Sequence, residues 1–255
     1  MVRPMNETPG ETQKTRDFGY EEVAADEHTR RVREVFDSVA KRYDLMNDLM
    51  SGGIHRLWKA ELIRMLRPRP NQSLVDVGGG TGDLAFKFLA KGGATVTVID
   101  INEQMIRVGR DRALDRGLLD PVWVTGSAED LPLADNSVDA YVTAFAMRNV
   151  TRQHKALEEA RRVLRPGGRY LCLEFSRVVI DPLRPLYDAY SFNILPRLGQ
   201  VVAGDADSYR YLAESIRRFP PQEQFAAMIE TAGLAQVTWR NLTGGIAAIH
   251  SARRI

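Results

Sequence analysis

The sequence predicts an α/β fold: a doubly wound, seven-stranded, mostly parallel sheet with helices on both faces and an N-terminal helical cap. Three observations support this prediction. Between residues 72 and 176, short β-branched runs alternate with amphipathic helical segments, glycine and proline turns separate them, and the chain ends in a strand–turn–strand pattern. Alternating strands and helices pair in parallel through right-handed crossovers, whereas a terminal hairpin makes the last strand antiparallel.

The elements of this core follow one another in a regular order. The first strand is expected at 74–77, before a helix that Asp83 can cap. The second strand, at 94–99, is rich in β-branched residues and ends at Asp100. Asn102 can cap the helix that follows. Further strands are expected at 122–124, 138–142 and 170–173, and the terminal hairpin pairs 235–242 with 245–250 around a Thr243-Gly244 turn.

We divide the chain into a flexible leader at 1–26 and a single domain at 27–255. The leader mixes acidic and basic residues, unlike a signal peptide or an acid-poor transit peptide, which favours a cytoplasmic protein. Within the domain we expect a helical cap at 27–66, a ligand-binding core at 72–176, an insertion on the substrate side at 181–219, and a final helix and hairpin at 220–255.

Composition narrows the function classes. The formal charge is +2, from 35 basic and 33 acidic residues that are interspersed, which disfavours nucleic acid as a partner. Cys172 is the single cysteine, so an intramolecular disulfide cannot form. Four scattered histidines give no metal-ligand spacing, and we expect no metal. No apolar run is long enough to span a bilayer.

The loop after the first strand carries the most information. A dinucleotide fingerprint needs glycine at its first, third and sixth positions, but the sixth position counted from Gly78 is Asp83. A phosphate-binding Walker loop would need Gly-Lys-Ser/Thr, which is absent from this segment. The remaining pattern, Asp76-x-Gly78-x-Gly80-x-Gly82, resembles the cofactor loop of S-adenosylmethionine-dependent methyltransferases.

This ligand suits such a loop because it has no pyrophosphate. Its methionine end carries an ammonium, a carboxylate and a sulfonium. Small residues allow close approach of the backbone, and the helix that begins near Asp83 offers N–H groups to the carboxylate. Two roles remain open for Asp76, which either orders the loop or lies near the ammonium.

Two later segments agree with this ligand. Asp100, at the end of the second strand, can accept hydrogen bonds from both ribose hydroxyls, although nicotinamide cofactors use the same device. After the third strand, residues 126–132 match the loop that holds adenine in these enzymes, where Ser127 and Ala128 face the base. All three features follow strands, at the edge where α/β sheets bind ligands.

The segment Tyr43-Asp44-Leu45-Met46-Asn47, continued by Ser51, His55 and Trp58, resembles one family. It is the ubiquinone and menaquinone biosynthesis C-methyltransferase family, with further agreement at 79–83, 147–150, 162–168 and 173–176. The resemblance runs from about residue 35 to the C-terminus. It implies a class I S-adenosylmethionine-dependent methyltransferase that methylates a ring carbon of a polyprenylated benzoquinol or naphthoquinol.

The resemblance also implies particular contacts. The family's cofactor contacts fall on Thr81, Asp100, Ser127 and Ala128, whereas Ala144 replaces a small polar residue that many relatives have.

Transfer to carbon needs an electron-rich ring, best as a phenolate, aligned with the methyl group and sulfur. The candidates are Arg148 to stabilise phenolate charge, directly or through water, with Asn149 and Tyr43 to position ring oxygens. His55 is a further candidate. The structural alternatives are that Arg148 pairs with an acid, Tyr43 packs the cap and His55 lies on a helix surface.

A polyprenyl acceptor needs an apolar path. The 181–200 segment could line a tail groove or touch the inner face of the cytoplasmic membrane; equally, it packs onto the sheet or forms a homodimer contact. Its apolar side chains are Leu183, Leu186, Tyr187, Tyr190, Phe192, Ile194, Leu195 and Leu198.

Two other functions share the cofactor loops: an O- or N-methyltransferase for another small acceptor, and a non-catalytic S-adenosylmethionine-binding scaffold in a quinone-synthesis complex. An O- or N-methyltransferase would differ from the quinol enzyme in the cap, whereas the intact cofactor loops and the polar Tyr43, Arg148 and Asn149 argue against a non-catalytic scaffold. The choice between benzoquinol and naphthoquinol, the tail length, the general base and the oligomeric state stay open.

Overall fold

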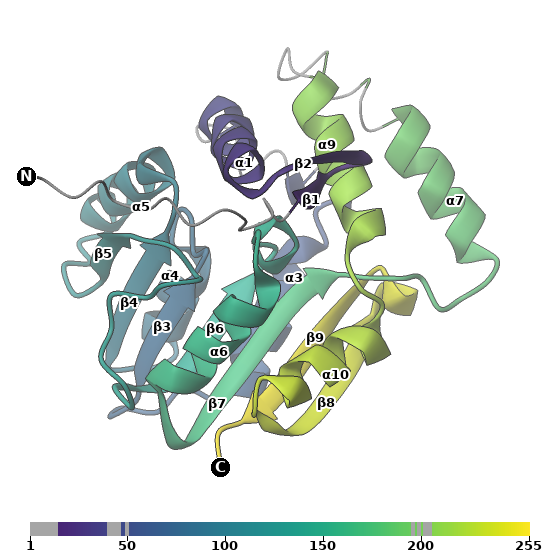
Figure 1. The fold of residues 1–255 in the computed structure, drawn as a ribbon. Helices are drawn as coiled ribbons and strands as arrows, with labels where there is room; N and C mark the ends of the chain where they lie inside the picture. The colour runs from purple at the N-terminus through teal and green to yellow at the C-terminus, as the bar shows by residue number, and fades with distance from the viewer. Residues whose placement is uncertain (1–14, 40–46, 49–50, 195–196, 198–199, 201–205) are drawn as a thin grey trace, which may run out of the picture.

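The computed structural model describes residues 15–39, 47–48, 51–194, 197, 200 and 206–255. Within them, seven strands form one sheet in the order β5-β4-β3-β6-β7-β9-β8 (Figure 1). The strands are β3 (Ser73–Val77), β4 (Thr95–Asp100), β5 (Val122–Thr125), β6 (Val138–Ala144), β7 (Leu164–Phe175), β8 (Ala235–Leu242) and β9 (Ala247–Arg253).

The pairing confirms the predicted topology. Strands β3 to β7 pair in parallel, and the last strand, β9, is antiparallel to both β7 and β8. The chain order reverses beside β3, which pairs with β4 on one side and β6 on the other. In a doubly wound sheet the loops diverge at such a point and leave a crevice at the carboxyl ends of the strands.

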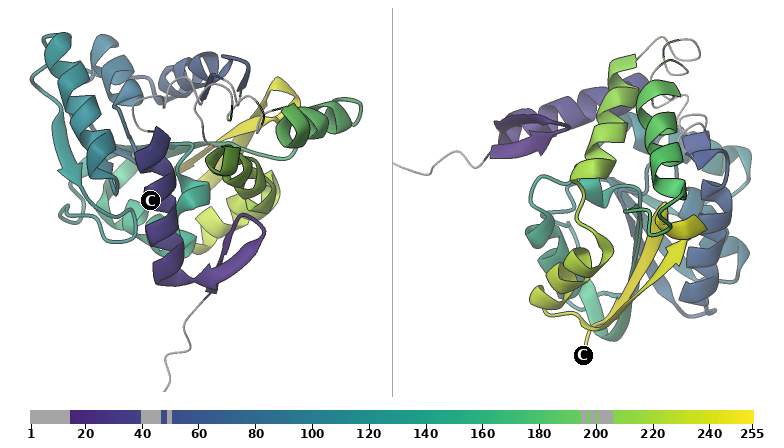
Figure 2. Two further views of the ribbon diagram at one scale, coloured as in Figure 1. Left: turned by 90° about the horizontal axis from the view of Figure 1, so that it is seen from above. Right: turned by 90° about the vertical axis from the view of Figure 1, so that its right-hand side faces the viewer.

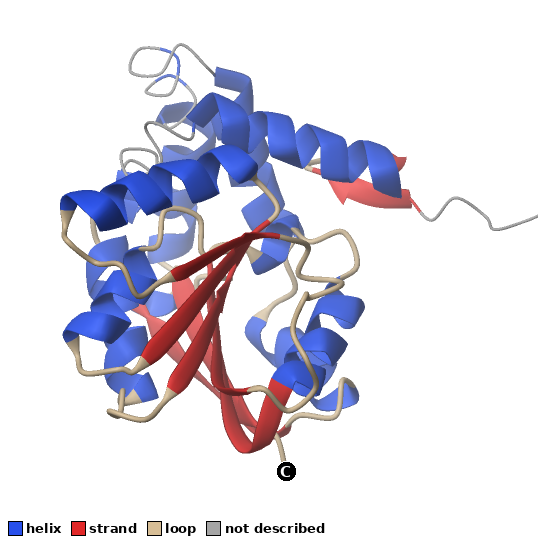
Figure 3. Cartoon of the chain, turned by 90° about the vertical axis from the view of Figure 1, so that its left-hand side faces the viewer, coloured by secondary structure: helices blue, strands red, loops and turns tan. Residues whose placement is uncertain are grey.

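Helices cover both faces of the sheet (Figure 3). Buried side chains of α3 (His55–Leu66), α4 (Asp83–Ala90) and α9 (Ala206–Arg218) share one apolar cluster with one face. Those of α6 (Gln153–Val163) and α10 (Gln222–Thr231) pack against the other. The remaining helices are α5 (Glu103–Asp115), α7 (Leu183–Ala189), the π-helix η3 (Tyr190–Ile194), and the short 3₁₀ turns η2 (Met147–Asn149) and η4 (Thr243–Gly245).

The N-terminal segment differs from the expected leader over residues 15–26. Strands β1 (Thr15–Phe18) and β2 (Glu21–Ala24) form an antiparallel hairpin, and α1 (Ala25–Val39) follows directly. The Phe18 ring stacks on Tyr211 of α9 at a centroid distance of 4.1 Å. This apolar contact orders a segment whose charge pattern alone resembles a free tail. Figure 2 shows α1 beside the carboxyl end of the sheet.

Two local expectations have different outcomes. Asn102 caps α5, because its side chain accepts a hydrogen bond from the Met105 amide at 3.0 Å. Asp83 does not cap α4: Gly82 is the N-cap, and Asp83 instead pairs with Lys59 and Lys87. Among the described residues, no helix is both long and apolar enough to cross a membrane.

Candidate functional site

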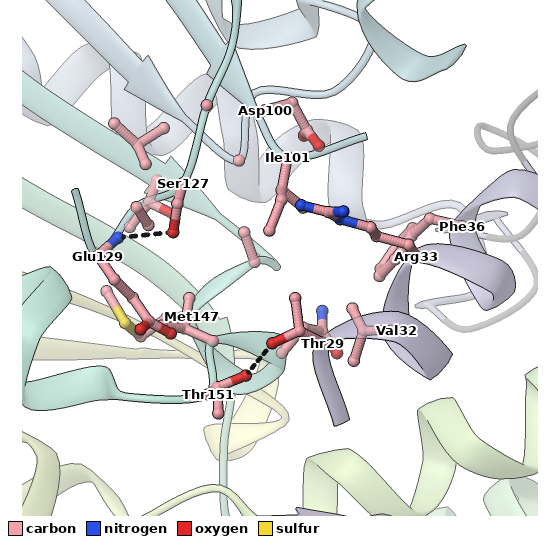
Figure 4. Close-up of a pocket in the computed structure, with 18 of the residues that line it drawn as sticks. Thr29, Val32, Arg33, Phe36, Asp100, Ile101, Ser127, Glu129, Met147 and Thr151 are labelled. Carbon is pink, nitrogen blue, oxygen red and sulfur yellow. Dashed lines mark hydrogen bonds between the residues drawn. The ribbon is translucent and has the colours of Figure 1, made fainter. Parts of the chain in front are cut away.

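A cavity of about 510 Å³ lies between α1 and the loops at the carboxyl ends of β3, β4, β5 and β6 (Figure 4). The predicted positions Gly78, Asp100, Ser127, Ala128 and Asn149 all line it. Its volume is in the range of small-molecule sites. The sheet edge expected to bind a ligand therefore contains a cavity lined by five of the ten predicted site residues.

The glycine loop approaches its neighbours too closely for side chains. Gly78, Gly80 and Gly82 have φ angles of 64°, 54° and 80°, in the left-handed region that favours glycine. A Cβ on Gly78 would lie 2.3 Å from the Cβ of Ala146, and one on Gly82 would lie 2.4 Å from the Trp123 ring. The alternating glycines thus place the loop after β3 directly against the loop after β6.

Asp100 is held by the backbone with its carboxylate facing the cavity. One oxygen accepts a hydrogen bond from the Gly80 amide and the other from the Asn102 amide, each at 2.9 Å. Burial raises the pKa of Asp100 to about 6, although the amides that bond to it counteract the shift. Each carboxylate oxygen has a further lone pair, so Asp100 can still accept bonds from two ligand hydroxyls.

Asp76 lies beneath the glycine loop, outside the cavity lining. Both carboxyl oxygens are buried and make no side-chain hydrogen bond within the described residues. Burial raises the pKa of Asp76 to about 7, helped by the like charges of Asp83 and Asp100, while the nearby Lys59 ammonium and the Ala85 amide only partly oppose this. A buried carboxyl with so few partners is costly, and a cation at the neighbouring loop would stabilise its charged form.

The loop after β5 contributes two predicted residues to the cavity, whereas Thr81 of the glycine loop lies outside the cavity lining. Ser127 and Ala128 line the cavity, and Ser127 Oγ accepts a hydrogen bond from the Glu129 amide at 3.1 Å (Figure 4). Thr81, in contrast, is buried behind the loop, where its hydroxyl accepts a bond from Arg112 at 2.7 Å. We infer that Thr81 anchors the loop to α5.

Helix α1 forms one wall of the cavity. The sequence had assigned this segment only to a helical cap. The Thr29 and Thr151 hydroxyls lie 2.9 Å apart and join α1 to the loop after β6. Arg33 extends from α1 across the cavity toward Ile101 (Figure 4). His28 also bonds to Thr151, at 2.8 Å, and burial lowers its pKa to about 4, so it is neutral at pH 7. The sequence predicted a helical cap at 27–66 but not the surface that its first helix covers.

Arg148 forms a buried ion pair at the same sheet edge. Its guanidinium lies 2.8 Å from Glu174 of β7, and both side chains are 1% exposed. It also donates a hydrogen bond to the Phe145 carbonyl. Arg148 does not line the cavity. Arg148 therefore pairs with an acid, as one of the two alternatives from the sequence expected. The other alternative, that Arg148 stabilises the charge of a phenolate, stays a prediction.

Asn149 lines the cavity and is oriented by two contacts. Its Oδ1 accepts a hydrogen bond from the Tyr211 hydroxyl of α9 at 3.1 Å, and its Nδ2 lies 3.4 Å from the Phe145 carbonyl. Sequence reasoning missed Tyr211, which lies 62 residues further along the chain.

The helical cap at 27–66 contains two further candidate residues, Tyr43 and His55. Tyr43 lies outside the described residues. His55 is buried and its Nε2 lies 2.9 Å from Asp48, so it does not lie on a helix surface. Burial lowers the pKa of His55, which favours the neutral imidazole.

The geometry fits S-adenosylmethionine by its chemistry. The Asp100 carboxylate can accept hydrogen bonds from hydroxyls such as those of a ribose, and Ser127 offers a polar side chain at the same cavity. In the described part of the chain, no cluster of three or more His, Cys, Asp or Glu side chains could hold a metal ion.

Comparison with known proteins agrees with this arrangement. The sequence pattern of the ubiE/COQ5 methyltransferase family matches residues 23–254. A ubiquinone/menaquinone biosynthesis C-methyltransferase UbiE from Methylobacterium nodulans is 60% identical over 94% of this chain and 96% of its own. The UbiE protein of Acidiphilium cryptum is 53% identical over 95% of this chain and 98% of its own.

Solved structures support the fold at lower identity. A methyltransferase from Thermotoga maritima, described as a possible histamine N-methyltransferase, covers 88% of this chain and all of its own with a TM-score of 0.63 and 19% identity. A methyltransferase from Aquifex aeolicus covers 82% of this chain and 97% of its own, with a TM-score of 0.58 and 18% identity. At these identities the likeness concerns the fold alone.

We expect substitutions of Arg148 and Glu174 to have strongly coupled effects on the free energy of unfolding. Arg148→Met or Glu174→Leu alone should reduce the free energy of unfolding by about 3–5 kcal/mol, because each leaves a buried group unpaired. The double variant should lose far less than the sum of the two. Urea denaturation monitored by circular dichroism measures this cycle. Additive losses would mean that the two side chains do not form a buried pair.

Proposed function

The chain belongs to the ubiE/COQ5 methyltransferase family and is an S-adenosylmethionine-dependent methyltransferase, and we propose that it methylates a ring carbon of a polyprenylated hydroquinone. The observation that carries the proposal is the match of residues 23–254 to this family together with a cavity at the switch point of the sheet. Both UbiE relatives carry names that state C-methylation in ubiquinone and menaquinone biosynthesis.

We assign the cofactor to the strand ends in a fixed order. Its methionine end would lie at Gly78 and Gly80, its ribose at Asp100 and its adenine at Ser127 and Ala128. The buried Asp76 would support the ammonium through the loop above it. This order follows β3, β4 and β5 and leaves the acceptor beside the loop after β6, which contacts Gly78 through Ala146.

When bound, the cofactor would supply an electrophilic methyl group to the ring carbon, which would lose a proton. The chain must then hold the ring and favour its phenolate form. We propose that Asn149, fixed by Tyr211, positions a ring oxygen. Arg148 acts as a positioning residue that holds the turn at Met147–Asn149 through Phe145 and Glu174.

We further propose that the acceptor's tail enters from the α7 side. The side chains of Val179, Ile180, Phe192 and Ile194 are exposed there, and those of Phe192 and Ile194 are 37% and 48% accessible. Tyr187 is buried, whereas the side chains of Leu183, Leu186, Leu195 and Leu198 lie outside the described residues. Exposed apolar side chains of this kind suit reversible contact with a membrane surface. Sedimentation of the Phe192→Asp variant with vesicles tests this contact.

Replacing Asp100 should weaken cofactor binding in a pH-dependent way. Asp100→Asn should reduce affinity for S-adenosylmethionine by about 10- to 100-fold at pH 7.5, at roughly 1.5–3 kcal/mol per charged hydrogen bond. Because the pKa of Asp100 is raised to about 6, the wild-type affinity should be complete above that pH and decline below it. Calorimetry at several pH values measures both effects. Equal affinity in the two proteins at every pH removes Asp100 from the site.

The acceptor chemistry predicts where the methyl group goes. With isotope-labelled cofactor and a short-tailed demethylmenaquinol, the label should appear on a ring carbon. Asn149→Ala should lower kcat about tenfold or more while cofactor affinity stays within about twofold, because Asn149 faces the acceptor. Label on oxygen would contradict the proposal and favour the alternative of an O-methyltransferase.

A further inference from the structure

A second cavity lies at the opposite end of the sheet. It has a volume of about 700 Å³ and lies at the amino ends of β3, β6 and β7, beneath the C-terminal turn of α3. The C-terminus, two residues beyond Arg253, marks this end of the sheet, away from α1 (Figure 1). Seven arginines line the cavity beside a single carboxylate, Asp139: Arg64, Arg67, Arg69, Arg165, Arg169, Arg240 and Arg253.

Three of these arginines have acidic partners. Arg165 pairs with Asp139 at 2.8 Å, and Arg64 and Arg240 share Glu61, each at 2.6 Å. Surface pairs of this kind neutralise charge locally but contribute little to stability.

The other four arginines have no carboxylate partner among the residues that the structure describes. Arg169 donates to the carbonyls of Met65 and Leu66, at 2.6 and 2.9 Å, and Arg253 donates to the Gly167 carbonyl at 3.2 Å. Burial lowers the pKa of Arg169, and the guanidiniums of Arg253, Arg67 and Arg69 lower it further. The four cations thus repel one another around a concave surface.

The backbone holds two of these arginines in unusual settings. Arg67 ends α3 in the left-handed conformation, with φ 54°. Glycine adopts this conformation without strain, and any other residue is disfavoured. Arg69 stands between Pro68 and Pro70, and the Gln72 amide bonds to its carbonyl at 3.0 Å, so the loop that carries it is restricted. Charge repulsion and backbone strain are therefore both present at this cavity in the free protein.

We propose that this cavity is a binding site for a soluble small molecule carrying two or more linked phosphate groups. Guanidiniums offer planar pairs of donors that match phosphate oxygens. Four arginines that have no carboxylate partner among the described residues come from three separate elements, the α3–β3 loop, β7 and β9. They converge on one concavity of small-molecule size. A bound polyanion would remove the repulsion among Arg67, Arg69, Arg169 and Arg253.

The position of the cavity favours a soluble ligand over a lipid headgroup. It opens at the amino ends of the parallel strands, whereas the exposed apolar side chains from Val179 to Ile194 follow the carboxyl end of β7. A bilayer at the arginines would lie away from those side chains and from the cofactor cavity.

The test is calorimetric titration of the full chain with inorganic tripolyphosphate, pyrophosphate and monophosphate in 150 mM salt. We expect binding to strengthen with the number of phosphates. The variant Arg67→Gly, Arg69→Gln should weaken tripolyphosphate binding by at least about tenfold, because each arginine provides charged hydrogen bonds. Glycine suits the left-handed position, so this variant should fold, and it should unfold at a higher temperature than wild type in low salt without ligand.

A matched control variant removes the same charge from the exposed surface of α5, as Arg107→Gln, Arg110→Gln. It should bind tripolyphosphate like wild type, and both variants should keep their S-adenosylmethionine affinity. An equal loss in the control, or absence of binding by wild type, would overturn the proposal.

Two further titrations identify the source of the anion. Octa-aspartate should bind much more weakly than tripolyphosphate, and comparable affinity would contradict a phosphate site in favour of an acidic peptide. Association with phosphatidylglycerol vesicles should be unchanged in the Arg67→Gly, Arg69→Gln variant. If that variant lost vesicle binding instead, the cavity would serve a lipid headgroup and the proposal of a soluble ligand would be wrong.

Discussion

The loop after β3 passes so close to its neighbours that the rest of the site depends on its backbone. Gly78 leaves no room for a side chain against Ala146, and Gly82 leaves none against Trp123. Its left-handed turns also present the Gly80 amide to Asp100, which fixes that carboxylate toward the cavity. One steric constraint thus links three neighbouring strand ends, and a methyl group on Gly78 or Gly82 would collide with Ala146 or Trp123.

Buried charge is the second feature of this sheet edge. This edge contains two ion pairs, Arg148–Glu174 and Lys59–Asp83, and the carboxyls of Asp76 and Asp100. Burying charge opposes folding. Preorganised charges of this kind suit a reaction in which a cationic sulfonium becomes a neutral thioether. The same logic applies at the far end of the sheet, where unpaired arginines leave repulsion that a ligand would relieve.

The sequence predicted the strands well because they rest on local rules, whereas the residues assigned to the cofactor stay predictions. Alternating glycines, β-branched runs and an Asn102 cap each depend on a few neighbouring residues. Sequence reasoning missed contacts between distant segments. Tyr211 donates a hydrogen bond to Asn149 from α9, and Phe18 stacks on the same tyrosine. Neither the contact that orients Asn149 nor the hairpin at 15–24 could be derived from periodicity.

The arginine cavity was missed for the same reason, since its residues are spread from Arg64 to Arg253 among acidic neighbours. The catalytic roles were harder still. The sequence allowed Arg148 either to pair with an acid or to act on the acceptor. Only the fold brings Glu174 next to it. Local patterns therefore predicted the strands and the glycine turns, whereas the surroundings of Arg148 and Asn149 depend on tertiary contacts.

The central claim, that this chain transfers a methyl group to the ring of a polyprenylated quinol, is tested most directly by quinone profiling. Cells of the source organism that lack the chain should accumulate the quinone one ring methyl short, and the wild-type chain should restore the methylated form. A normal quinone profile in those cells, with no other methyltransferase able to replace this one, would contradict the account.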